Sequence, residues 1–283
     1  MGVRPLACAL AALAALALGG SATAGVADGV RYLRAAQGAD GGFGESGDPS
    51  DVGLTAWAVL GLRGAGASPS RRQAAADFLI DGDDASVTDL ELRILALDAL
   101  GRGVGSLADR LARRRAADGR IGPTVNATIW GVLALRSAGR PAGRSTVRWL
   151  LRQQRPGGGW SWAVGGRADS NDTAAAIQAL RATGVSARSR AIVRAVRFLR
   201  RLQNRDGGFE LTPGRGSDAQ STAWAMQALV AARQRPGRAA FRYLNRLQRT
   251  NGSFRYSARY GVTPVWVTAQ VLPALTRRPY PVS

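Results

Sequence analysis

The fold of this chain can be read from one stretch, Gln154-Arg155-Pro156-Gly157-Gly158-Gly159-Trp160. Its spacing of glutamine, three residues, glycine, one residue and an aromatic side chain recurs in clear form elsewhere in the chain. The clear copies run from Gln37 to Phe43, Gln154 to Trp160, Gln203 to Phe209 and Gln248 to Phe254. Two degenerate copies complete the set, one with Asp83 in the glutamine position after Phe78 and one running from Arg115 to Ile121. Repetition at this period predicts six copies of one supersecondary unit.

Each copy is followed by a second apolar segment. These segments cover residues 52–65, 89–100, 127–138, 173–183, 222–232 and 266–275. The first four are followed by a glycine, at Gly66, Gly101, Gly139 and Gly184, which is a helix stop signal. Each unit is therefore expected to be a pair of helices.

The two helices of a unit differ in kind. Residues 189–203 place aliphatic side chains on one side and arginines on the other, which predicts an amphipathic surface helix. Residues 222–232 are apolar nearly all round, and such a helix needs neighbours on most sides. The alternation predicts an all-α (α/α)6 toroid, with six inner and six outer helices forming one domain over residues 25–283.

The first 24 residues have the layout of a cleaved secretory signal. Arg4 precedes an apolar run over residues 6–18, and small residues lead to Ala24. The run is too short to cross a bilayer. We therefore expect cleavage near Ala24 and a protein that is secreted or associated with the cell envelope, without a transmembrane anchor.

The composition limits the possible chemistry. Cys8 is the only cysteine and there is no histidine, so the mature chain has no disulfide, no thiolate nucleophile and no imidazole base. We expect neither a metal site nor a cofactor.

The charge indicates the kind of partner. All 39 basic residues are arginine, they outnumber 19 acidic residues, and the formal net charge is +20. This balance favours an anionic cell-envelope polymer, an acidic glycan or lipid head groups. The arginines lie on the polar sides of amphipathic helices without interleaved aromatics, so nucleic acid is not expected as a partner.

The repeats resemble those of a known superfamily. The glutamine-to-aromatic spacing resembles the QW motif of squalene-hopene cyclases, and Thr222-Ala223-Trp224 and Asp172-Thr173-Ala174 are similar to that family's inner-helix starts. Over residues 26–276 the chain is identified as a member of the terpenoid cyclase and protein prenyltransferase α/α-toroid superfamily, which also contains secreted repeat proteins. The resemblance implies the toroid and leaves activity open. The glutamines and aromatics themselves are interpreted as structural, tying loops to neighbouring helices.

Two acidic stretches bear on the cyclase interpretation. Asp81-Gly82-Asp83-Asp84 matches the first letters of the cyclase acid box, but it falls at the end of an outer helix, where a solvated turn is expected. The stretch in the family's register is Asp169-Ser170-Asn171-Asp172-Thr173-Ala174, and there Asn171 takes the position of the proton donor. An amide cannot act as a carboxylic acid. Asp51 and Asp218 align with Asp169, and helix capping is the expected role of all three.

Other enzymatic interpretations have weaker support. The protein prenyltransferases that the chain resembles bind zinc through aspartate, cysteine and histidine, and the mature chain lacks two of these residue types. A glycosidase or lyase could pair Asp169 or Asp172 with Glu45 or Glu210. Cobalamin carriage rests on the toroid alone, without the small β domain that such carriers usually add.

Three tryptophans occupy equivalent positions on inner helices, Trp57, Trp130 and Trp224. They either line a lumen and form an apolar pocket or fill space between the two helical layers. We favour a noncatalytic protein that binds a small apolar, isoprenoid-like ligand or an anionic partner. The alternative is an isoprenoid-processing enzyme that uses Asp169 and Asp172. The candidate ligand-binding residues are Trp57, Trp130, Trp224, Asp51, Asn171, Asp218 and the rim residue Trp162.

Overall fold

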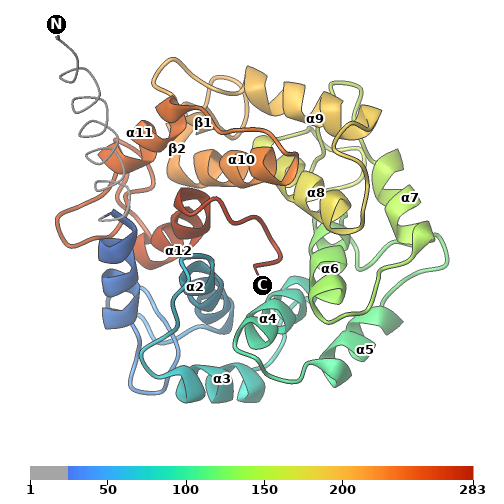
Figure 1. Ribbon diagram of the computed structural model, residues 1–283. Helices are drawn as coiled ribbons and strands as arrows, with labels where there is room; N and C mark the ends of the chain where they lie inside the picture. The colour runs from blue at the N-terminus through green and yellow to red at the C-terminus, as the bar shows by residue number, and fades with distance from the viewer. Residues whose placement is uncertain (1–24, 283) are drawn as a thin grey trace, which may run out of the picture.

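The computed structural model describes residues 25–282, so the predicted leader lies outside the described residues. Within that range twelve helices form six consecutive hairpins, each with an outer helix followed by an inner one. Figure 1 shows the inner helices arranged in a ring around the C-terminal segment, with the outer helices around them. The predicted all-α toroid is confirmed.

The elements follow one another in a regular order. The outer helices cover residues 25–35, α3 (Arg72–Asp81), α5 (Gly105–Arg113), α7 (Arg144–Arg152), α9 (Arg190–Arg201) and α11 (Arg238–Arg246). The inner helices are α2 (Val52–Gly64), α4 (Val87–Ala99), α6 (Val125–Ser137), α8 (Ser170–Ala182), α10 (Ala219–Ala231) and α12 (Pro264–Leu275). A short antiparallel pair, β1 (Phe209–Glu210) with β2 (Ser217–Asp218), lies in the loop before α10.

The ring is closed by contacts between its first and last hairpins. Each inner helix contacts the inner helices of the two neighbouring hairpins, and α12 contacts α2. The Gln248 side-chain amide donates to the carbonyl of Gly25 at 2.7 Å. The Glu45 carboxylate accepts from the backbone N–H groups of Val265 and Trp266 at 3.0 and 2.9 Å. Residues far apart in sequence therefore complete the same repeating pattern.

Burial separates the two layers as the sequence predicts. In α10 every residue from Ser221 to Leu229 is buried, whereas α9 buries Ile192, Ala195 and Leu199 and exposes its arginine face. The inner helices bury most of their residues and the outer helices only a few, so the inner layer supplies the larger share of the buried apolar surface.

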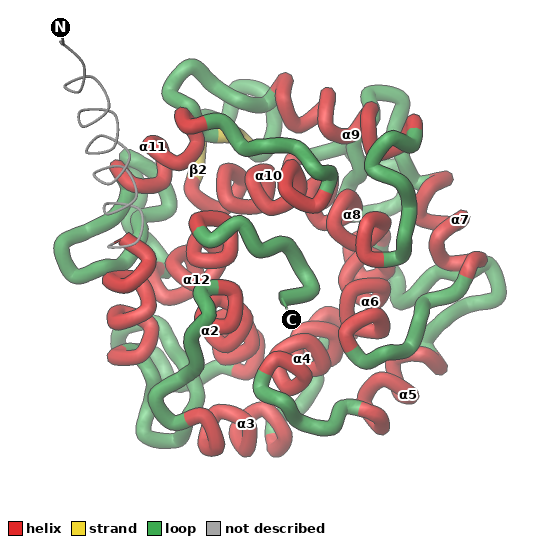
Figure 2. The backbone as a smooth tube through the Cα atoms, in the orientation of Figure 1, coloured by secondary structure: helices red, strands yellow, loops and turns green. Residues whose placement is uncertain are grey.

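The inner helices end in a common backbone conformation. Gly66, Gly101, Gly139 and Gly184 have φ values of 75°, 73°, 69° and 90°, which favour glycine. In the last two hairpins the corresponding left-handed residues are Arg233 and Arg277, each with φ 57°. Short connections leave from these ends, whereas the glycine-rich loops precede the inner helices (Figure 2). The toroid therefore has a rim of loops and a rim of short turns.

Candidate functional site

The loop rim is held by a repeated set of backbone contacts. The Gln154 amide donates to the carbonyls of Gly158 and Ala191, both at 2.8 Å, and so ties its own loop to α9. Gly158 has φ 98°, and a Cβ there would lie 2.7 Å from the Arg194 carbonyl oxygen. The backbone N–H of Trp160 donates to the Thr173 hydroxyl at 2.9 Å. The structural role expected of the glutamine and the aromatic is confirmed.

The same clamp recurs around the ring. A threonine hydroxyl one turn into the inner helix accepts from the backbone N–H of the loop aromatic or its equivalent. The accepting hydroxyls belong to Thr55, Thr128, Thr173, Thr222 and Thr268. The threonine in the cyclase-like stretches therefore stabilises the loop.

Three of the loops also cap the preceding inner helix. The carbonyl of Trp162 accepts from Asn126 N–H, that of Leu211 from Ser170 N–H, and that of Tyr256 from Ala219 N–H. The Trp162 side chain itself is 61% exposed on the loop rim. The structure thus places the Trp162 side chain on the loop rim, whereas Trp57, Trp130 and Trp224 lie in or against the hydrophobic core.

The Asp81–Asp84 stretch lies at the end of α3, outside the inner-helix register, as expected. Asp81 and Asp83 are exposed, but the expectation of a solvated turn is wrong for Asp84. Its carboxylate is bound by the buried Arg93 guanidinium at 2.6 Å and by Arg110. Asp84 therefore forms ion pairs with two arginines, and its role is structural.

Asp169, which is half-buried, and Asp172, which is buried, form a carboxyl pair at the start of α8. Asp169 caps the helix by accepting from Asp172 N–H at 2.8 Å. Burial, followed by the nearby Asp172 charge, raises the pKa of Asp169 to about 8. Burial also raises the pKa of Asp172, although the Asn126 amide donates to Asp172 at 2.7 Å and opposes that shift. One proton is therefore retained in this pair at neutral pH.

The other aligned residues serve as helix caps. Asp51 accepts from Leu54 N–H, and Asp218 accepts from Ser221 N–H, each at 2.7 Å. Burial raises the pKa of Asp218. Asn171 lies between Asp169 and Asp172 in the sequence, and its side-chain oxygen accepts from the Ser170 hydroxyl at 3.2 Å.

A hollow of about 770 Å³ adjoins Asp218 on the loop rim.

The glutamates considered for a paired-carboxylate site are bonded to backbone groups. Glu45 accepts the two N–H groups at the start of α12. Glu210 accepts from Gly214 and Gly216 N–H, both at 3.0 Å, and so shapes its own loop. Their carboxylates thus close the ring and order a loop.

The three equivalent tryptophans converge on the axis of the toroid. Ring centroids are 5.3 Å apart for Trp57 and Trp130, 5.3 Å for Trp130 and Trp224, and 5.8 Å for Trp57 and Trp224. Trp224 donates its indole N–H to Gln270 at 2.6 Å. The tryptophans therefore line the axis, and the space among them is occupied by their own rings.

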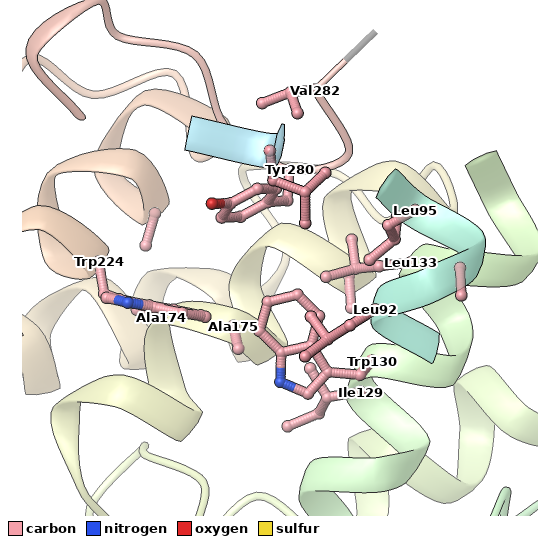
Figure 3. Packing of buried hydrophobic residues seen from close by; sticks show 14 of the residues in the cluster. Leu92, Leu95, Ile129, Trp130, Leu133, Ala174, Ala175, Trp224, Tyr280 and Val282 are labelled. Carbon is pink, nitrogen blue, oxygen red and sulfur yellow. The ribbon is translucent and has the colours of Figure 1, made fainter. Parts of the chain in front are cut away.

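The C-terminal segment completes this cluster. Tyr280 lies over Trp130 and Trp224 in Figure 3, with centroid distances of 5.8 and 6.1 Å, and it is 6.1 Å from Trp57. Its backbone N–H donates to the Gln178 side chain at 2.7 Å. Its hydroxyl is buried without a partner among the described residues. The tail thus fills the axis from the rim of short turns, a contact that the sequence reasoning missed.

The comparisons with known proteins agree with this architecture. Residues 1–83 match the prenyltransferase alpha-alpha toroid domain, and residues 141–263 match the squalene-hopene cyclase C-terminal domain. The chain therefore has the α/α-toroid fold, and these parts of it are similar to the two domains. No curated protein matches the sequence of this toroid.

Solved structures show the same fold at low sequence identity. A protein from Actinoplanes superposes with a TM-score of 0.69 and 22% identity, covering 90% of this chain and 99% of that one. A type II terpene cyclase from Scytonema in complex with geranylgeranyl dihydroxybenzoate gives 0.68 and 18%, covering 91% and 97%. The Candida albicans protein geranylgeranyltransferase-I complexed with GGPP gives 0.65 and 14%, covering 82% and 85%.

None of the helices within residues 25–282 has both the length and the apolarity needed to cross a membrane. Nor do three or more acidic, cysteine or histidine side chains in that range converge in a way that could hold a metal ion.

Proposed function

We propose that this protein is an exported, noncatalytic toroid that binds its partner without converting it. The observation that carries the proposal is the filled axis. A cyclase needs an interior chamber that folds an isoprenoid chain, whereas here Trp57, Trp130, Trp224 and Tyr280 contact one another at the centre. The asparagine at the family's donor position supports the same conclusion. The leader-like residues 1–24 support export.

The proposed partner is anionic, and the proposed small ligand is apolar. A formal net charge of +20 supports attraction to an anionic cell-envelope polymer or surface. Two structural neighbours hold geranylgeranyl compounds, which supports an isoprenoid-like ligand for the aromatic cluster. Such a ligand would have to take the place of Tyr280, because that ring packs against all three tryptophans.

A second candidate function is isoprenoid processing at the loop rim. Asp169, with its pKa raised to about 8, keeps a proton at neutral pH beside Asp172, and a retained proton is what a general acid requires. The pair also caps α8, which accounts for its position without catalysis.

Incubation of residues 25–283 with squalene and with geranylgeranyl diphosphate separates the two candidates. Mass spectrometry of the lipid extract should show unchanged substrate if the protein is noncatalytic. A new cyclised or hydrolysed product that disappears in both Asp169→Asn and Asp172→Asn would establish the second candidate instead. Asp51→Asn is the matched control, because it changes an equivalent cap in another hairpin.

Binding of a small apolar ligand can be tested with a variant of Tyr280 in the C-terminal segment. Native mass spectrometry of the purified protein should detect a copurifying apolar molecule. Titration with geranylgeraniol should change the intensity or wavelength of tryptophan emission more strongly in Tyr280→Ala than in the unchanged protein, since the variant vacates one side of the cluster. Equal changes in Tyr280→Ala and in Tyr260→Ala, a loop-rim control, would argue against binding at the axis.

A further inference from the structure

The rim of short turns carries a basic groove. Two hollows of about 740 and 700 Å³ adjoin there and share Arg181 and Gly184. The first lies between the ends of α6 and α8 and the start of α7, and the second lies between the connection after α8 and the end of α10. Together they follow the rim across three successive hairpins. We call this feature the arginine groove.

The charge of the groove is of one sign. Six arginines line it, namely Arg136, Arg144, Arg148, Arg181, Arg188 and Arg233. The described residues that line the two hollows include no aspartate or glutamate. The salt bridges found within residues 25–282 use Arg31, Arg93, Arg110 and Arg140, so the six groove arginines are not neutralised by them. A concave surface lined by one sign of charge concentrates counter-charged ligands.

Arg181 is fixed where the two hollows meet. Its Nε donates to the Ala231 carbonyl at 2.9 Å, and its Nη1 donates to the Val185 carbonyl. The side chain therefore links the ends of α8 and α10, and no bond from its Nη2 is found within residues 25–282. A guanidinium held in this way loses little conformational entropy when it binds an anion.

The first hollow adds backbone donors and an apolar floor. Helix α7 begins there at Arg144, and its N-cap residue, Gly143, supplies no side-chain acceptor for the first N–H groups. These groups and the helix dipole favour a negative charge. Pro141, Ala142 and Val147 provide apolar surface beneath the arginines. The groove can thus contact both the charges and the uncharged backbone of a ligand.

We propose that the arginine groove binds a linear anionic polymer whose charged groups repeat along an unbranched chain. The inference rests on the anionic partner of the proposed function and deepens it by assigning the site. Extension over three hairpins suits a polymer, since a single small anion would occupy one hollow. A lipid surface fits the groove less well, because Trp162, Val164, Tyr260 and Val262, four of the exposed large apolar side chains, lie on the loop rim. Neither hollow is lined by an aromatic side chain on which nucleobases could stack.

The test compares two triple variants of residues 25–283 that remove equal charge. The groove variant is Arg144→Gln, Arg148→Gln and Arg188→Gln. The control variant is Arg113→Gln, Arg205→Gln and Arg242→Gln, all exposed residues outside the groove. Long-chain inorganic polyphosphate and poly-glutamate serve as probes, with affinities measured by calorimetry at several salt concentrations.

Polyphosphate, poly-glutamate or both should bind the unchanged protein, and the groove variant should lose about tenfold or more in affinity while the control loses less than threefold. The slope of log affinity against log salt should fall by about two in the groove variant, since each phosphate contact of a flexible chain contributes roughly 0.7. Equal losses in the two variants would show diffuse attraction and overturn the groove. Tighter binding to anionic phospholipid vesicles, unchanged in the groove variant, would also overturn it. Neither result would bear on whether the toroid is catalytic.

Folding of the variants is checked separately by circular dichroism and thermal midpoint. Hydrogen exchange gives an independent readout on the unchanged protein. Bound polymer should slow exchange at residues 143–147 and leave the loop at residues 249–263 unaffected. Protection that is confined to the loop rim would contradict the assignment.

Discussion

The second and fourth hairpins perform the same structural task with different chemistry. In the fourth, Gln154 and Thr173 tie a glycine-rich loop to its neighbours through neutral hydrogen bonds. In the second, Leu90 replaces the threonine, and Arg93 instead binds the Leu79 and Ile80 carbonyls and the Asp84 carboxylate. The toroid therefore requires the end of each outer helix to be tied to its inner helix, but the tie can use different side chains.

The two solutions differ in their electrostatic cost. Helix α4 buries Glu91 and Arg93 at the positions where α8 has Ala174 and Ala176. Burying charge is costly unless it is paired, and the Glu91 carboxyl oxygens have no hydrogen-bond partner among the described residues. Substitutions that remove a charge should therefore reduce stability most in the second hairpin. Substitutions that remove a neutral hydrogen bond should reduce it most in the fourth.

The largest effect is expected at Arg93. Arg93→Met should lower the free energy of unfolding by about 3–5 kcal/mol, because it leaves the buried Asp84 and two carbonyls short of a partner. Urea titration at pH 7 measures the loss. Arg197→Met on the exposed face of α9 is the control and should change stability by less than about 0.5 kcal/mol. Equal effects would remove the distinction between the hairpins.

The matching change in the fourth hairpin is Thr173→Val. It should cost about 1–3 kcal/mol, because the buried Trp160 N–H loses its acceptor. Differential scanning calorimetry should show the lower midpoint, while the exposed Thr250→Val leaves it unchanged. A loss as large as that of Arg93→Met would mean that neutral and charged ties are equally critical.

Glu91→Leu should stabilise the protein, by about 1–2 kcal/mol at pH 7, because it removes an unpartnered buried carboxyl. Burial raises the pKa of Glu91 well above 4.5. The native state therefore keeps a proton that the unfolded chain releases, so Glu91 lowers stability progressively as the pH rises above 4.5. Chemical denaturation should give a larger gain at pH 7 than at pH 4. A gain that does not depend on pH would contradict this account of Glu91.

Asp169→Asn is expected to have the smallest effect on the free energy of unfolding at low pH. Asparagine keeps the helix cap, so stability at pH 4 should change by only a few tenths of a kcal/mol. Between about pH 4 and 8 the folded protein keeps the Asp169 proton, because its pKa is raised, whereas the unfolded chain releases that proton. The free energy of unfolding of the unchanged protein therefore falls as the pH rises through this interval. The variant should show a flatter stability curve over this interval. A curve parallel to that of the unchanged protein would assign the pH dependence to other groups.

The sequence predicted the number, order and two kinds of helix, and it located the ends of the inner helices better than their beginnings. It placed the starts of the fourth and fifth inner helices at residues 173 and 222, whereas α8 begins at Ser170 and α10 at Ala219. The first turns of these helices, Ser170-Asn171-Asp172 and Ala219-Gln220-Ser221, are largely polar and so lack the apolar pattern that marks the rest. The ends were marked by glycines that adopt positive φ.

The functional surroundings were less predictable. Tyr280 belongs to no repeat, so nothing in its spacing indicated that it reaches the three tryptophans. Asn126 lies in a degenerate hairpin, and only the fold brings it to Asp172. The proton retained by Asp169 depends on burial and on a neighbouring charge, two quantities that a linear motif does not contain.

The bond from Gln248 to Gly25 has a consequence for biosynthesis. During synthesis, the helix over residues 25–35 and the flank of α2 emerge long before α12 exists to cover them. The contact that closes the ring can form only after the sixth hairpin has left the ribosome. Until then an apolar surface of the first hairpin is exposed to solvent. A truncated chain that lacks the sixth hairpin should therefore need a chaperone to avoid aggregation.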